Sequence, residues 1–221
     1  MKQSESPSAP TPQRYGRYVG MLGLLLLGLI TLNTVLSKPN GAHGIEPGQP
    51  MAPFAVPLAK GTLNGEADIA TRPNQGLAGK VPACSERGPA ILNICELYEQ
   101  GPVVLALFVD RGSCAGILQQ MQNLSSQFPS VRFAAVAIKE GRGELPSVIR
   151  AHGLSIPIGF DNDGVLADLY KLASCPQVNF AYRGGEVQSP ALLGTPTIGT
   201  LRARVSQLLA AARARAHHQP A

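Results

Sequence analysis

The sequence predicts an α/β fold in which helices flank a central mixed sheet, preceded by an N-terminal transmembrane helix. Two observations predict the sheet: short apolar runs alternate with segments of helical spacing from residue 101 onward, and the last run leads into a tight turn and a hairpin partner. Strands that alternate with helices are typical of a largely parallel sheet with covered faces, and the hairpin adds antiparallel strands. A third observation, an uncharged run near the N-terminus, predicts the transmembrane helix.

The N-terminal region is predicted to cross the membrane once. Residues 1–17 are mostly polar and proline-rich, which is typical of a disordered segment. Residues 18–36 carry no charge and have about the length of a membrane-spanning helix. Arg14 and Arg17 precede this run, so the positive-inside rule predicts a cytoplasmic N-terminus, a single-pass cell-membrane anchor and an extracytoplasmic C-terminal domain. A cleaved signal peptide is the alternative, but "VLS" at 35–37 is a poor cleavage site.

Composition divides the rest of the chain into three parts. Residues 37–53 are rich in glycine and proline, which predicts a tether of semi-rigid character. Residues 54–216 contain the alternating apolar runs and are predicted to form the folded domain. Residues 217–221 are expected to be a disordered tail.

The elements of the first half of the domain follow from apolar spacing. Residues 101–109 form a continuous apolar run after a Gly-Pro turn signal, which predicts a fully buried strand. Residues 117–128 place Ile117, Met121 and Leu124 at helical spacing, and the next residue is a proline, which ends the helix. Residues 131–138 are a second buried apolar run and are predicted to be the next strand.

The second half continues the alternation. A short helix is predicted over 143–153 and another over 165–172, with a short extended piece and a turn between them at 156–164. Residues 177–182 are predicted to be a strand, because "RGG" at 183–185 reads as a tight turn before a hairpin partner. The last element is a long helix over 197–216 whose apolar face is formed by Leu201, Val205, Leu208 and Leu209.

The charge distribution gives no indication of nucleic-acid binding. The formal net charge is +5 over 221 residues, but the basic residues gather at the two ends of the chain. A nucleic-acid-binding surface is expected to have clustered basic residues interleaved with aromatic residues. The basic residues of this chain form no central stretch and do not alternate with aromatic residues.

Cys114 is the first candidate site residue. It lies between a predicted buried strand and a predicted helix, the place where functional residues collect in open α/β sheets. The N–H groups and dipole of a helix N-terminus stabilise a thiolate. The polar loop "DRGSCAG" indicates partial exposure, whereas the alternative is a small buried apolar residue, as most free cysteines are.

Cys84 and Cys95 form a separate pair of cysteines ahead of the first core strand. Their C-x10-C spacing is not a usual zinc spacing, and no histidine or third cysteine lies nearby, so no metal site is predicted. A structural disulfide that closes a short loop is favoured, worth roughly 3 kcal/mol in the chain-entropy model.

The order of elements, Cys114 at the first strand–helix junction and Cys175-Pro176 before the hairpin together resemble the thioredoxin-like superfamily. The opening "EPGQPMAPFAVPLAKGTL" and the stretch "IGFDNDGVLADLYKLASCPQVNFAYRGGEV" are similar to its membrane-tethered branch of thiol–disulfide oxidoreductases and peroxiredoxin-like redoxins. The resemblance covers roughly residues 46–215. It implies a thioredoxin-like fold, a cis peptide bond at Pro176 beside the site, and no cofactor.

The chain departs from the family's motifs at the strand–helix junction. The family's C-x-x-C is replaced by "CAGI", so Ile117 stands where the second cysteine is expected. Arg111 and Leu107 occupy the positions at which peroxiredoxins carry threonine and proline. Peroxidase activity is therefore in doubt, although Arg111 could stabilise a Cys114 thiolate by its charge.

The resemblance implies a different pair of cysteines. The residue before the cis-proline faces the active-site cysteine in this superfamily, so Cys114 and Cys175 are expected to form a redox couple, with Cys84–Cys95 as the second pair. The favoured function is thiol–disulfide exchange with protein thiol or disulfide substrates or a redox partner, Cys114 attacking and Cys175 resolving. Two alternatives stay open: a thiol peroxidase that uses Cys114, and a non-catalytic binding module whose disulfides are both permanent.

Overall fold

The computed structural model describes residues 13–36, 44–65 and 81–218, and the chain divides into two compact units, Met1–Gly41 and Ala42–Ala221. The first unit contains α1 (Gln13–Leu36), which includes the helix predicted over 18–36. Residues 13–17, expected to be disordered, are helical, and residues 1–12 lie outside the described part. Within the described residues, no helix combines the length and the apolar character that a membrane span requires.

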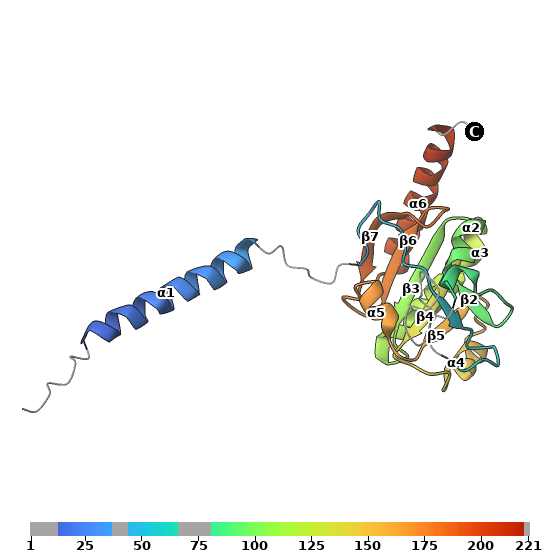
Figure 1. The fold of residues 1–221 in the computed structure, drawn as a ribbon. Coiled ribbons are helices and arrows are strands. Elements are labelled where there is room, and N and C mark those ends of the chain that lie inside the picture. The colour runs from blue at the N-terminus through green and yellow to red at the C-terminus, as the bar shows by residue number, and fades with distance from the viewer. Residues whose placement is uncertain (1–12, 37–43, 66–80, 219–221) are drawn as a thin grey trace, which may run out of the picture. The chain divides into compact units, whose positions relative to one another are not determined.

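A five-stranded mixed sheet forms the centre of the second unit (Figure 1). Its strands lie in the order β5-β4-β3-β6-β7. β3, β4 and β5 are parallel, β6 is antiparallel to β3, and β7 is antiparallel to β6. The predicted parallel sheet with an antiparallel hairpin is confirmed. The strands are β3 (Val103–Phe108), β4 (Arg132–Ile138), β5 (Ile158–Asp161), β6 (Gln177–Ala181) and β7 (Val187–Leu193).

Two apolar cores cover the two faces of the sheet. Alternate side chains of β3 enter opposite cores, as strand geometry requires: Phe108 packs into one and Leu107 into the other. The Phe108 core is closed by α3, α4 and α6, and the Leu107 core by α2 and α5. These helices are α2 (Ile94–Gln100), α3 (Ile117–Gln127), α4 (Leu145–Ala151), α5 (Val165–Leu169) and α6 (Ile198–His218).

Helices α3 and α6 begin and end close to their predicted positions. α3 buries Ile117, Met121 and Leu124 and ends before Phe128, next to the proline that the sequence marks as a stop. On α6, the predicted apolar face is confirmed, because Leu201, Val205 and Leu208 are fully buried and Leu209 packs partly against the same core. α6 runs on to His218, so the first two residues of the predicted tail are helical, and residues 219–221 lie outside the described part.

The segment predicted to be a tether is partly built into the domain. Residues 37–43 lie outside the described part, but residues 44–53 pack against β7 and its turn. Gly48 N–H donates to Val187 O at 2.8 Å, and Met51 N–H donates to Gly185 O at 2.8 Å. Ile45 and Met51 are buried in the Leu107 core. The tether prediction is wrong for these residues, because two apolar anchors dock a segment whose composition otherwise resembles a linker.

A small two-stranded sheet, which the sequence did not predict, closes one edge of the domain. It pairs β1 (Ala55–Pro57) with β2 (Ile91–Asn93) in antiparallel fashion. Leu58, just after β1, forms a bridge with Gly159 of the edge strand β5. β5 therefore meets the small sheet closely at Gly159.

We expect Gly159→Ala to lower the free energy of unfolding by about 1–3 kcal/mol, the usual cost of overpacking a tight core. A Cβ at this position would collide with Val56 Cγ2 and come within 3.1 Å of Leu92 Cδ2. Gly199→Ala on α6 is the matched control, because its Cβ would meet only Thr197 Oγ1 at 3.8 Å, and alanine favours a helix. Urea unfolding of both variants checks this, and equal stabilities would show that the two sheets are not tightly packed there.

Candidate functional site

The loop after β3 places Cys114 at the carboxyl end of the sheet. Cys114 lies in a short 3₁₀ helix, η2 (Gly112–Gly116), which runs directly into α3. Gly112, with φ of +57°, makes the turn that starts η2, and Cys114 N–H donates to Arg111 O at 3.3 Å. The cysteine is thus one turn before the α-helix, and its side chain is only 6% exposed within the Phe108 core. The partial exposure expected of Cys114 is wrong.

Cys175 reaches the same point from the loop that precedes β6. The peptide bond between Cys175 and Pro176 is cis, as the resemblance implies. Cys175 forms a disulfide with Cys114, with a Cα–Cα distance of 5.5 Å, within the usual range for a bridge. Cys175 is partly exposed, whereas Cys114 is buried. The structure thus confirms the expected pairing, between one buried and one partly exposed cysteine.

A backbone amide contacts both sulfurs. Val109 N–H donates to Cys175 Sγ at 3.1 Å and to Cys114 Sγ at 3.4 Å. The reason lies in strand register: Leu107 pairs with Gln177, and continuing that register by two residues places Val109 opposite Cys175. The Val109 amide, just after β3, therefore donates to sulfur and not to a backbone carbonyl of the neighbouring strand. An N–H donor binds a thiolate more strongly than a neutral sulfur, so this amide favours the reduced, ionised state of either cysteine.

The loop that carries Cys175 is held from the β7 side. Gly194 N–H, just after β7, lies 2.9 Å from Pro176 O and 2.7 Å from Ser174 Oγ, and both oxygens accept from it. Pro176 itself is buried. These bonds fix the residues on either side of Cys175, so the position of its sulfur is set by the fold.

Two buried polar side chains that were not predicted as site residues, Gln177 and Asn179, support this loop. Gln177 Nε2 donates to Tyr170 O at 2.9 Å, and Gln177 Oε1 accepts from Ala173 N–H at 3.1 Å. Gln177 Nε2 also lies 3.3 Å from Asn179 Oδ1, and Asn179 Nδ2 donates to Leu105 O at 3.4 Å. A glutamine and an asparagine on alternate positions of a predicted strand were the available signal, because such side chains share one face of the strand and need internal partners if that face is buried.

We expect Gln177→Met to destabilise the protein by about 1–3 kcal/mol, because the buried Tyr170 carbonyl loses its donor. Methionine has a similar length and no amide, so packing is largely kept. The control is Gln119→Met on the exposed surface of α3, where the amide donates to Asn123 Oδ1 at 3.3 Å. Urea denaturation measures both changes. A loss no larger than that of the control would mean that Gln177 does not hold the loop.

Arg111 is not directed at the sulfurs in this structure. Its side chain is 84% exposed, and its Nε lies 3.7 Å from Glu140 Oε1, which follows β4. This weak ion pair links the Cys114 loop to the next loop of the sheet edge. Its role as a thiolate partner of Cys114 stays a prediction.

The predicted structural disulfide between Cys84 and Cys95 is also present, with a Cα–Cα distance of 5.3 Å. Asn93 organises its loop: its Oδ1 accepts from Cys95 N–H at 2.8 Å and caps α2, while its Nδ2 donates to Ala83 O at 2.7 Å. This bridge lies with α2 at the Leu107 core, whereas Cys114 lies in the Phe108 core on the other face of the sheet.

Asp161 is a buried carboxyl group at the carboxyl end of β5. Burial and a hydrogen bond with Asp163 raise the pKa of Asp161 to about 7, against the opposing effect of the N–H groups that it accepts. These donors are Leu166 N–H at 2.9 Å and Gly164 N–H at 3.1 Å. The "DNDG" segment therefore works as a turn that starts α5. Among the described residues, no group of three His, Cys, Asp or Glu side chains is placed to hold a metal ion.

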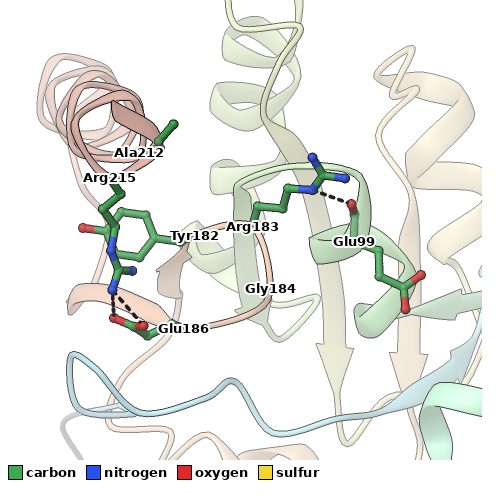
Figure 2. A pocket seen from close by; sticks show the side chains of 8 residues that line it. Glu99, Tyr182, Arg183, Gly184, Glu186, Ala212 and Arg215 are labelled. Carbon is green, nitrogen blue, oxygen red and sulfur yellow. Dashed lines mark hydrogen bonds and ion pairs between the residues drawn. The ribbon is translucent and has the colours of Figure 1, made fainter. Parts of the chain in front are cut away.

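A separate hollow of about 700 Å³ lies at the other end of β6, around the β6–β7 turn and α6 (Figure 2). Its carboxylates are already paired, since Glu186 accepts from Arg215 at 2.8 Å and Glu99 from Arg87 at 2.7 Å. Arg215 also lies over the Tyr182 ring, 4.2 Å from its centroid. This hollow is remote from the cysteines, because the turn follows β6 whereas Cys175 precedes it.

Comparison with solved structures shows the class of fold. A provisionally named thiol:disulfide interchange protein DsbE from Chlorobium tepidum is 14% identical with a TM-score of 0.55, over 76% of this chain and 98% of the other. A provisionally named protein disulfide isomerase from Bacteroides thetaiotaomicron is 12% identical with a TM-score of 0.57, over 80% and 99%. Peroxidoxin BcpB from Mycobacterium tuberculosis is 14% identical with a TM-score of 0.52, over 77% and 97%.

These likenesses show a thioredoxin-like α/β fold. At such low identity they concern the fold and not the reaction. No protein-family model matches the sequence, and no curated protein matches it. The function therefore has to be argued from the site.

Proposed function

We propose that this protein carries out thiol–disulfide exchange through the Cys114–Cys175 pair. The observation that carries the proposal is the bridge itself, which joins two loops at the carboxyl end of the sheet and includes one partly exposed cysteine, Cys175. Val109 N–H lies within hydrogen-bonding distance of both sulfurs and can stabilise the thiolate released when the bridge opens. The electrons move between sulfur atoms, so the reaction needs no cofactor.

The site replaces the usual pair within one loop by a pair across two loops. A C-x-x-C segment would carry both cysteines at the start of α3, but Ile117 occupies the second position and is fully buried. Cys175 supplies the second thiol from the loop before the neighbouring strand β6. A substrate would therefore meet two loops from separate parts of the chain.

A thiol peroxidase has less support from the same geometry. Peroxide reduction would start from a free and accessible Cys114 thiolate, whereas Cys114 is bonded to Cys175 and 6% exposed. The positive charge expected to assist it, that of Arg111, lies with Glu140. The likeness to a peroxidoxin concerns the fold.

The proposed location is outside the cytoplasm, with the uncharged run of residues 18–36 as the anchor and protein thiols or disulfides as partners. Two disulfides in one domain support such a compartment, since disulfides persist where the environment is oxidising. A membrane-impermeant maleimide applied to intact cells after mild reduction tests this location. Labelling only after lysis would contradict it.

Replacing either Cys114 or Cys175 by serine is expected to lower the rates of insulin reduction and of oxidation of a scrambled substrate by at least about 100-fold, because the reacting atoms are removed. The double variant Cys84→Ala/Cys95→Ala is the control, and it should keep the wild-type rate at a temperature where it is folded. If Cys114→Ser and Cys175→Ser both kept the wild-type rate, the bridge would be a permanent staple of a binding module.

A further inference from the structure

The two sulfurs of the bridge differ in how a third sulfur can reach them. Cys114 is a member of the buried Phe108 core and is 6% exposed, whereas Cys175 lies at the rim of that core and is partly exposed. A thiolate attacks a disulfide in line with the S–S bond, from the side opposite the sulfur that leaves. Attack on Cys114 would require approach from the apolar core, and attack on Cys175 approach from its exposed side.

The leaving sulfur also has its support in place. When the bond breaks at Cys175, the electron pair goes to Cys114 Sγ, which lies 3.4 Å from Val109 N–H and within η2, directly ahead of α3. The amide donor stabilises a thiolate on either cysteine, since it also lies 3.1 Å from Cys175 Sγ, whereas the N-terminal end of α3 directly follows the loop of Cys114 in the chain. The buried sulfur is therefore suited to leave and return without contact with the substrate.

We propose that substrates form their mixed disulfide on Cys175, and that Cys114 is the resolving cysteine. This reverses the roles that the sequence predicts, and it rests on the proposed exchange function. In oxidation of a dithiol, one substrate thiolate bonds to Cys175 Sγ while the Cys114–Cys175 bond breaks and Cys114 leaves as a thiolate. The second substrate thiolate then attacks the substrate sulfur of the mixed disulfide, which releases an oxidised substrate and a Cys175 thiolate.

The reverse direction uses the same contact. A Cys175 thiolate attacks a substrate disulfide and expels one substrate thiolate, and Cys114 then attacks Cys175 Sγ and expels the other. Two electrons move in each direction, and the protons are exchanged with solvent. In both directions the covalent intermediate is on Cys175, which is held by Ser174 and Pro176 through their bonds to Gly194.

The test compares Cys114→Ser with Cys175→Ser, each with the Cys84–Cys95 bridge intact and each allowed to react with oxidised glutathione. We expect the Cys175 thiol of the first variant to form the glutathione mixed disulfide at least about tenfold faster than the Cys114 thiol of the second, because thiol access controls the exchange rate. A faster reaction of Cys114 would overturn the proposed order but leave the exchange function standing. No reaction of either thiol in the folded variants would overturn both.

The wild-type protein provides a second readout that needs no folded variant. Oxidised protein is mixed with reduced glutathione, quenched with acid within the reaction time and mapped by mass spectrometry. Glutathione is expected on the peptide that contains Cys175. Glutathione on the peptide that contains Cys114 would contradict the proposed order.

Discussion

Removing the Cys114–Cys175 bridge is expected to lower the free energy of unfolding by about 4 kcal/mol, compared with about 3 kcal/mol for the Cys84–Cys95 bridge. The difference follows from loop length, because the cysteines are 61 residues apart in the first pair and 11 in the second. A longer loop restricts the unfolded chain more when it is closed. The double alanine variants are well matched, since each pair joins one buried and one partly exposed cysteine.

Urea unfolding of the wild type and the two double variants measures this order. Equal losses, or a larger loss for Cys84→Ala/Cys95→Ala, would show that chain entropy does not govern the stabilities. The result also bears on function. A domain that cycles between oxidised and reduced states has to stay folded without the site bridge, so the remaining interactions have to exceed this loss of about 4 kcal/mol.

Stability is expected to fall as the pH rises from about 4 to 7, because of Asp161. Burial raises the pKa of Asp161 to about 7 in the folded protein, compared with about 4 in an unfolded chain. Between these values the folded protein holds a proton that the unfolded chain has released, so raising the pH favours unfolding. The contribution is fully present below pH 4, is lost through pH 7, and amounts to about 4 kcal/mol at most.

The measurement is the difference in unfolding free energy between the wild type and Asp161→Asn across this pH window. The asparagine cannot ionise and keeps an oxygen for one of the two N–H donors, so its profile should be flatter than that of the wild type. Asp168→Asn, at an exposed position of α5, is the control for the loss of one carboxylate. Parallel profiles for the wild type and Asp161→Asn would rule out Asp161 as the source of the pH dependence.

Much of the central sheet could be predicted because its signals are local. β3, α3 and β4 appear almost where the apolar runs and the proline stop place them. The Cys114–Cys175 pairing and the cis bond at Pro176 were available only through the family resemblance, because neither follows from spacing.

Other features depend on contacts that no local pattern contains. The polar residues around Cys114 predict exposure, but Cys114 packs into the Phe108 core. Residues 44–53 have the composition of a linker, yet Ile45 and Met51 bury their side chains in the Leu107 core. The contact of the Val109 amide with the two sulfurs could not be predicted from the sequence, because it depends on where the pairing of β3 with β6 ends.

The most direct test of the central claim is the redox behaviour of the two bridges in one sample. The protein is equilibrated in glutathione buffers of increasing reducing strength, alkylated and mapped by mass spectrometry. We expect Cys114 and Cys175 to be labelled together, with a reduction potential above about −300 mV, while Cys84–Cys95 stays closed. A site bridge that opens only below about −300 mV, or only after Cys84–Cys95, would mark it as structural and contradict the exchange function.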